Sequence, residues 1–191
     1  MRTGSGRIIK ILVATLFSAT LVGCGMSPVG ILPDAPLLDD TTNLDAASPL
    51  PSDDCKALGE PSTETHREMF EALNNFRVAN GLEPLVYSTR LEAAANAHAR
   101  DLYERGYFAH INPDGENPGK RAVQAGFCHE YVGENIAAGQ KSVQAAQIAW
   151  ENSPSHRENM LQPAYKMVGM GFYQDPTGRM YWAQELAYDL P

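Results

Sequence analysis

Basic residues are scarce in this sequence. Its 191 residues include 15 Lys and Arg against 23 Asp and Glu, which gives a formal net charge of -8 at pH 7. Nucleic acid binding requires a face rich in Lys and Arg that neutralises phosphates. The charge therefore argues against a nucleic acid partner, while a hydrophobic content of 43% indicates a globular rather than a disordered chain.

Compact catalytic motifs are also missing. The sequence has no His-Glu-x-x-His, no paired Cys-x-x-Cys, no Gly-rich phosphate loop and no internal repeat. Without a Gly-x-Ser-x-Gly elbow, the neighbours Ser155 and His156 give little support for a serine hydrolase. Cys128 beside His129 is equally weak as a nucleophile and base, because sequence neighbours rarely have that geometry. Any site must therefore be assembled from residues that are distant in sequence.

The apolar run near the N-terminus is too short for an ordinary transmembrane helix. Residues 11–21 follow three basic residues and lead into Leu-Val-Gly-Cys at 21–24. This pattern resembles the bacterial lipobox, where cleavage leaves Cys24 as a lipid-modified N-terminus; a plain signal peptide with a chance cysteine is the alternative. We expect residues 1–23 to be a signal peptide and the lipid on Cys24 to provide membrane attachment.

The predicted location is the bacterial cell envelope, with the domain outside the cytoplasm. Gly25 stands where Asp commonly marks retention at the inner membrane, and this favours the outer membrane. Removing residues 1–23 lowers the net charge to -11, because that segment holds three basic residues and no acidic ones. A basic surface patch is thus not expected to contribute to membrane attachment.

Cysteines are few. With Cys24 assigned to the lipid, Cys55 and Cys128 remain in an oxidising compartment and are predicted to form a disulfide. The alternative is two free thiols. A disulfide between them would tie the end of the preceding linker to the domain.

Residues 24–61 lack a sustained helical or strand periodicity. They hold six prolines and seven acidic residues against the single Lys56. This composition predicts a disordered linker that follows the lipidated cysteine and spaces the domain from the membrane. Residues 62–191 are then long enough for one domain with its own core.

Periodicity and capping residues predict the elements of this domain. Apolar residues at helical spacing favour helices over residues 65–80 and 89–105, a short helix capped by Asn117, and a helix from Ser142 to 152. Strands are expected over 166–174 and 179–188, and their apolar residues on both faces indicate a sheet covered by helices on both sides. The class is α+β.

Four residues stand out by their surroundings. His98 lies in the apolar stripe of the second helix and is predicted to be a core or cleft-edge histidine. His110 follows that helix on a loop, and His156 follows a helix break at 153–154. At strand spacing Glu134 shares a face with apolar neighbours two residues away on either side, and a carboxylate there needs a partner.

Several motifs carry a specific resemblance, and they span nearly all of residues 66–188. In order they are Tyr107–His110, Gly133–Ala137, Trp150 with Ser153–Leu161, Val168–Gly171 and Tyr181–Gln184. This set resembles the bacterial branch of the CAP superfamily (cysteine-rich secretory proteins, antigen 5, pathogenesis-related 1), whose domain is also called SCP. The resemblance implies a three-layer α-β-α sandwich with a central antiparallel sheet. It also implies a cleft where two histidines and two acidic residues meet.

By their motifs, His110, Glu134 and His156 correspond to three of those four residues. The fourth position is Ser153, where the family usually has Glu, and Glu151 lies nearby on a different helix face. Two imidazoles and a carboxylate can hold Zn²⁺ or another divalent cation with one open position. We therefore expect the side chains of His110 and His156 to lie within about 8 Å of each other.

Three functions are compatible with the resemblance. The first is a binding or interaction module for an envelope, peptide or lipid ligand, with or without a metal ion in the cleft. The second is a metal-dependent, peptidase-like hydrolase, and the third is a carrier of fatty acids or sterols. The missing nucleophile and the incomplete set of acidic residues favour the first.

Overall fold

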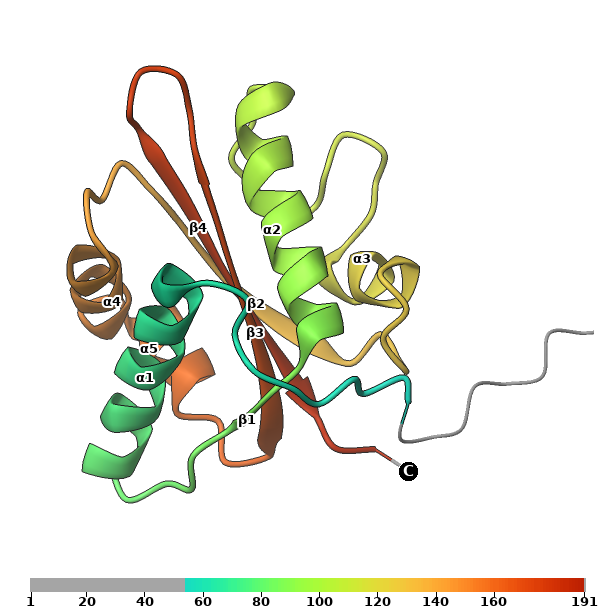
Figure 1. Ribbon diagram of the computed structural model, residues 1–191, viewed down its shortest axis with the longest axis vertical. Helices are drawn as coiled ribbons and strands as arrows, with labels where there is room; N and C mark the ends of the chain where they lie inside the picture. Colours follow the sequence, from blue (N-terminus) through green and yellow to red (C-terminus); the bar gives the residue numbers. More distant parts are fainter. Residues whose placement is uncertain (1–53, 191) are drawn as a thin grey trace, which may run out of the picture. The chain divides into compact units, whose positions relative to one another are not determined.

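The computed structural model describes residues 54–190 (Figure 1). The predicted signal peptide, Cys24 and the linker up to residue 53 lie outside the described residues. Among the helices that are described, none combines the length and the apolar character needed to cross a membrane.

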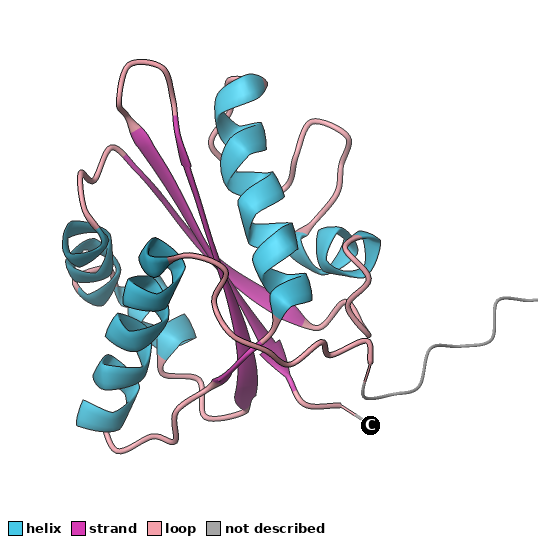
Figure 2. Ribbon diagram, viewed as in Figure 1, coloured by secondary structure: helices cyan, strands magenta, loops and turns pink. Residues whose placement is uncertain are grey.

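A four-stranded sheet forms the middle layer (Figure 2), in the order β1-β3-β4-β2. The strands are β1 (Val86–Tyr87), β2 (Val132–Ala138), β3 (Tyr165–Gln174) and β4 (Met180–Tyr188). The three long strands pair antiparallel, as expected, whereas β1 pairs parallel with β3. The sheet is therefore mixed at the edge formed by β1. The chain passes through β1 on its way from the helix on one face to the next helix, which lies on the other face (Figure 1).

Helices cover both faces of the sheet, which confirms the sandwich. They are α1 (Glu64–Ala79), α2 (Thr89–Glu104), α3 (Pro118–Gln124), α4 (Val143–Glu151) and α5 (Pro154–Met160). Figure 1 shows α1, α4 and α5 on one side and α2 and α3 on the other. One core cluster joins α1 and α4 to the sheet, and two others lie under α2 and α3.

Side-chain caps begin four of the helices. Asn117 and Ser142 cap α3 and α4 as the sequence predicts. The caps of α1 and α2 are Thr63 and Ser88, one or two residues earlier than expected, and each accepts a backbone N–H three residues later. The segment after the break at Ser153 forms a short helix, α5, which the sequence analysis did not predict.

Strand β3 lets α2 approach the sheet closely. A Cβ on Gly169 would lie 2.1 Å from the backbone nitrogen of Glu92, and one on Gly171 would lie 2.2 Å from the backbone carbon of Ala95. No side chain fits at either position, so α2 packs directly on the strand backbone. This close packing holds the inner face of α2, including His98, against the sheet.

The domain begins earlier than composition predicts. Cys55 and Cys128 form the predicted disulfide. Leu58 forms an antiparallel bridge with Ser88, and the amide of Gly59 donates to the carbonyl of Tyr87 at 3.2 Å. Residues 55–59, assigned to the linker because they lack periodicity, are thus held to the domain by one covalent bond and backbone pairing.

Candidate functional site

Glu134 is the buried centre of the site. It lies on β2, its side chain is 1% exposed, and it faces α2 together with Val132 and Ile136, as strand spacing predicts. Its partner across the sheet is Glu185 on β4. Two carboxyl groups are therefore buried side by side, and both need compensation.

Both oxygens of Glu134 are engaged. The Nδ1 atom of His110 lies 2.6 Å from Oε1, and Nη2 of Arg121 donates to Oε2 at 2.6 Å. The Nε2 atom of His98 lies 3.4 Å from the same Oε2. The carboxylate of Glu134 on β2 is thus the meeting point of three other segments: the loop that carries His110, helix α2 and helix α3.

The two carboxyl groups have opposite pKa shifts. Burial would raise the pKa of Glu134, but the hydrogen bond with His110 and the charges of His98 and Arg121 hold it below its usual value. Burial and the neighbouring Glu134 carboxylate raise the pKa of Glu185 well above its usual range. These effects favour the protonated form of Glu185, and in that form the carboxyl group can donate a hydrogen bond to Glu134.

His98 is a core histidine, as predicted, and it is also part of the site. Burial lowers its pKa to about 4, so the ring is neutral at pH 7. Its Nδ1 lies 3.3 Å from the hydroxyl of Tyr107, which donates to Asp101 at 2.5 Å.

Arg121 fixes the loop that carries His110. Its Nη1 donates to the carbonyls of His110 at 2.8 Å and Glu116 at 2.9 Å. Asn112 tightens the same loop, because its Oδ1 accepts the amides of Asp114 and Glu116 at 3.0 and 2.8 Å. The side chain of His110 is 50% exposed. With Nδ1 held by Glu134, its Nε2 lies on the opposite edge of the ring and is left for a ligand.

His156 lies on α5, where the charge of His110 acts on it. Burial and the charge of His110 both lower the pKa of His156. Its buried Nδ1 has no hydrogen-bond partner in the described part of the chain. Helix α5 is tied to β2 because Asn135 donates to the carbonyl of His156 and Asn159 donates to that of Glu134, each at 3.2 Å.

The two accessory candidates lie away from this network. Ser153 is the N-cap residue of α5 but makes no side-chain capping bond. Glu151, at the end of α4, accepts a hydrogen bond from Gln147 at 3.0 Å. Within residues 54–190, no hydrogen bond or ion pair links either side chain to His110, Glu134 or His156.

The metal-ligand set that the resemblance implies consists of His110, Glu134 and His156. Within the described residues, no group of three or more His, Cys, Asp or Glu is arranged to hold a metal ion. Glu134 already binds Arg121 through one oxygen and His110 through the other. Glu134 thus contacts Nδ1 of His110 and orients this imidazole, as carboxylates do for histidines that bind metal ions through the other ring nitrogen. The nitrogen atoms left to meet a cation are those of His110 and His156.

Sequence reasoning did not identify Arg121 or Glu185 as part of the site. Arg121 lies on the inner face of α3 and is 8% exposed. Glu185 alternates along β4 with the buried Ala183 and Ala187, and an acidic residue within such a stripe is a signal that could have been used. The signal for Arg121 is weaker, because a short helix gives little periodicity.

A three-layer sandwich with this buried histidine and glutamate pair defines the class of protein. The family model described as "CAP: Cysteine-rich secretory protein family" matches residues 70–186, and the chain belongs to this family. It is 32% identical over 119 residues to the Bacillus subtilis protein YkwD, covering 62% of this chain and 45% of YkwD. It is 28% identical over 122 residues to the B. subtilis membrane protein YlbC, covering 64% and 34%. The chain thus spans less than half of either relative.

Solved structures agree on the fold. An extracellular protein of Bacillus anthracis that contains an SCP domain superimposes with a TM-score of 0.61 and 25% identity, covering 69% of this chain and 45% of that one. An outer surface protein of Borrelia burgdorferi gives a TM-score of 0.60 at 21% identity, covering 66% and 97%. The second likeness concerns the fold alone.

Proposed function

We propose that this protein is an extracytoplasmic lipoprotein of the bacterial envelope that binds a ligand through the surface around His110 and His156. Its lipid would be attached to Cys24, and its ligand would be a peptide or lipid of the envelope. The extracellular SCP-domain protein of Bacillus anthracis among its structural relatives supports this location. The export signal in residues 1–23 supports it independently.

One observation favours binding over catalysis. Glu134, the carboxylate that would act as a general base, is 1% exposed and saturated by Arg121 and His110. Its pKa is low because the hydrogen bond and the positive charges outweigh burial, and a carboxylate with a low pKa accepts protons poorly. In this proposal Glu134 positions the imidazole of His110, and the exposed edge of that ring meets the ligand.

A divalent cation such as Zn²⁺ is compatible with the proposal. It would be held by the imidazoles of His110 and His156 and would supply open coordination positions for a ligand oxygen. Glu134 would then strengthen and orient the His110 imidazole through Nδ1. The chain's own residues provide this orientation whether or not a cation binds.

Hydrolysis and metal content test the choice between binding and catalysis. We expect the purified chain, with and without added Zn²⁺, to cleave no member of peptide, ester and glycan substrate libraries. Zn²⁺ bound per chain, measured by mass spectrometry, should fall on replacing His110→Ala or His156→Ala and stay unchanged for Glu151→Gln. Turnover that is abolished by either histidine substitution would establish the hydrolase instead.

Anchoring has its own test. The variant Cys24→Ser should move the protein from the membrane fraction to the soluble fraction and abolish incorporation of radiolabelled palmitate. Cys55 and Cys128 lie outside the lipobox, form the disulfide and are unchanged in this variant. They are therefore the internal control that labelling depends on Cys24 and not on cysteine in general. Labelling of the Cys24→Ser variant at the level of the unchanged chain would contradict the lipoprotein assignment.

A further inference from the structure

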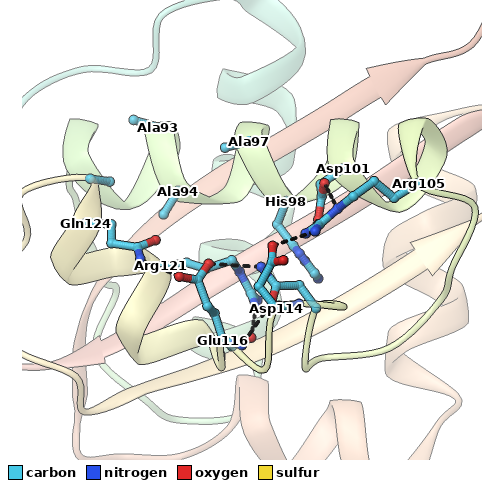
Figure 3. A pocket seen from close by; sticks show the side chains of 12 residues that line it. Ala93, Ala94, Ala97, His98, Asp101, Arg105, Asp114, Glu116, Arg121 and Gln124 are labelled. Carbon is cyan, nitrogen blue, oxygen red and sulfur yellow. Dashed lines mark hydrogen bonds and ion pairs between the residues drawn. The ribbon is translucent and has the colours of Figure 1, made fainter. Parts of the chain in front are cut away.

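His129 makes contacts that depend on its protonation state. Ion pairs between carboxylates and guanidinium groups behave differently: Arg105 pairs with Asp101 and Asp114 at the end of α2 (Figure 3), and such groups stay charged throughout the neutral pH range. An imidazole gains or loses its charge between about pH 5 and 8. Hydrogen bonds that require the neutral ring are therefore lost on mild acidification.

The imidazole of His129 bridges the ends of two strands. Strands β2 and β4 are antiparallel, and the first residue of β2, Val132, is paired with Ala187. The next positions in this register are Tyr131 and Tyr188. The Nδ1 atom of His129 lies 3.2 Å from the amide nitrogen of Tyr131, and its Nε2 lies 3.2 Å from the carbonyl oxygen of Tyr188. The ring thus takes the place of the next backbone hydrogen bond between the two strands.

These two contacts require a neutral ring with its hydrogen on Nε2. The amide of Tyr131 is a donor, so Nδ1 of His129 must present its lone pair. The carbonyl of Tyr188 is an acceptor, so Nε2 must carry hydrogen. In the imidazolium form both ring nitrogens carry hydrogen, and Nδ1–H would face the N–H of Tyr131. Protonation therefore breaks the contact with Tyr131 and leaves the donor to Tyr188 in place.

Two opposite charges act on the ring. Lys56 comes from the segment before α1 and Asp189 follows β4, and the two form an ion pair at 2.6 Å. The ammonium group lowers the pKa of His129 and the carboxylate raises it, so their effects oppose each other. Tyr131, whose ring centroid lies 5.9 Å from that of the imidazole, and the neighbouring Glu130 are the titratable residues of its own segment.

Burial is the main reason why the pKa of His129 lies below its usual value. Phe127 packs edge-on against the ring, with 4.9 Å between the centroids. The carbonyls of Tyr188 and of His129 itself act in the opposite direction, because they accept hydrogen bonds from the imidazolium, but burial outweighs them. A lowered pKa means that folding favours the neutral ring. Its contribution to stability is complete above the pKa of an unfolded histidine and is lost as the pH falls below it.

We propose that His129 is a proton-sensitive clip that joins the start of β2 to the end of β4. The neutral ring closes the clip, and protonation opens it at Tyr131. Because Cys128 precedes His129 and forms the disulfide with Cys55, the clip lies where the N-terminal segment is fastened to the domain. Acidic surroundings therefore loosen residues 129–131 at this junction, and neutral surroundings restore it. The clip is separate from the ligand surface around His110.

An NMR titration of the full chain, purified in detergent, tests this proposal. Between about pH 8 and about pH 5, the amide shift of Tyr131 should follow the titration of the His129 ring and not that of the other histidines. Amide exchange at Tyr131, corrected for the intrinsic effect of pH, should become roughly two- to tenfold faster, as expected for the loss of one hydrogen bond. The amide of Ala183, in the buried part of β4, should show no such change.

Substitutions separate the clip from other effects of acid. His129→Gln keeps a side-chain donor and acceptor but cannot gain a charge, so the pH dependence at Tyr131 should disappear. His129→Phe keeps a ring without either hydrogen bond, and exchange at Tyr131 should be fast at both ends of the titration. His110→Gln alters the ligand surface and should leave the Tyr131 titration unchanged. Equal exchange at both ends in the unchanged chain, or a pH dependence that survives in His129→Gln, would overturn the proposal.

Discussion

Replacing Arg121 with Met is expected to lower the free energy of unfolding by about 3 to 5 kcal/mol, the range for breaking a buried ion pair from one side. The side chain of Arg121 is 8% exposed and that of Glu134 is 1% exposed, so water cannot solvate the carboxylate left behind. The nearby Glu185 carboxyl offers one proton but no positive charge. A loss of this size is a large share of the total stability of an ordinary domain.

The same substitution should also loosen the His110 loop. Arg121 donates to the backbone carbonyls of His110 and Glu116, and Met offers neither hydrogen bond. Amide hydrogen exchange should therefore accelerate in residues 106–116 more than in the central strand β4 at denaturant concentrations well below the unfolding midpoint. Urea titration followed by circular dichroism measures the loss in global stability.

Two variants show whether the effect arises from the ion pair. Arg100→Met removes an exposed arginine of α2 that pairs with Glu104, and the urea midpoint should not change. The double variant Arg121→Met with Glu134→Gln removes both charges and should recover part of the loss, because no unpaired carboxylate remains. An Arg121→Met protein with the midpoint of the unchanged chain would show that the pair is not needed for folding.

Replacing both Cys55 and Cys128 with Ala is expected to cost about 4 kcal/mol of stability in the chain-entropy account of cross-links. The bond joins residues separated by 73 positions, so it restricts a long loop of the unfolded chain. Its loss should also weaken the bridge between Leu58 and Ser88, because residues 55–59 are then held only by non-covalent contacts such as the hydrogen bonds that Ser88 and Thr89 donate to the carbonyls of Lys56 and Ala57. The amide of Gly59, which donates to the carbonyl of Tyr87, reports this change by hydrogen exchange.

Reduction provides the matched control for the disulfide. Dithiothreitol should lower the urea midpoint of the unchanged chain to that of the Cys55→Ala, Cys128→Ala variant and should leave the variant itself unaffected. If the oxidised chain and the double variant unfold at the same urea concentration, the cross-link contributes nothing to stability. A midpoint lower than that of the reduced chain would instead indicate lost packing at the two positions.

Local sequence signals were enough to predict most elements of the fold. Asn117 and Ser142 begin α3 and α4 because their side chains accept backbone N–H groups that a helix start leaves unpaired. Alternation along residues 166–174 and 179–188 predicted two strands buried on both faces, which the structure has as β3 and β4. The short parallel strand β1 could not be predicted, since two residues carry no periodicity and only pairing with β3 defines them as a strand.

By itself the sequence determined that Glu134 would be a costly carboxylate between apolar neighbours, that His110 would lie on a loop, and that Cys55 and Cys128 were available to pair. Tertiary structure decided which groups compensate Glu134. Arg121 comes from α3, His98 from α2 and Glu185 from β4. Pairing of β2 with β4 brings Glu185 beside Glu134, and glycines in β3 let α2 pack closely on the sheet. The physical reason is that a carboxylate specifies a need for charge and hydrogen bonds, whereas packing specifies which distant side chain is near enough to supply them.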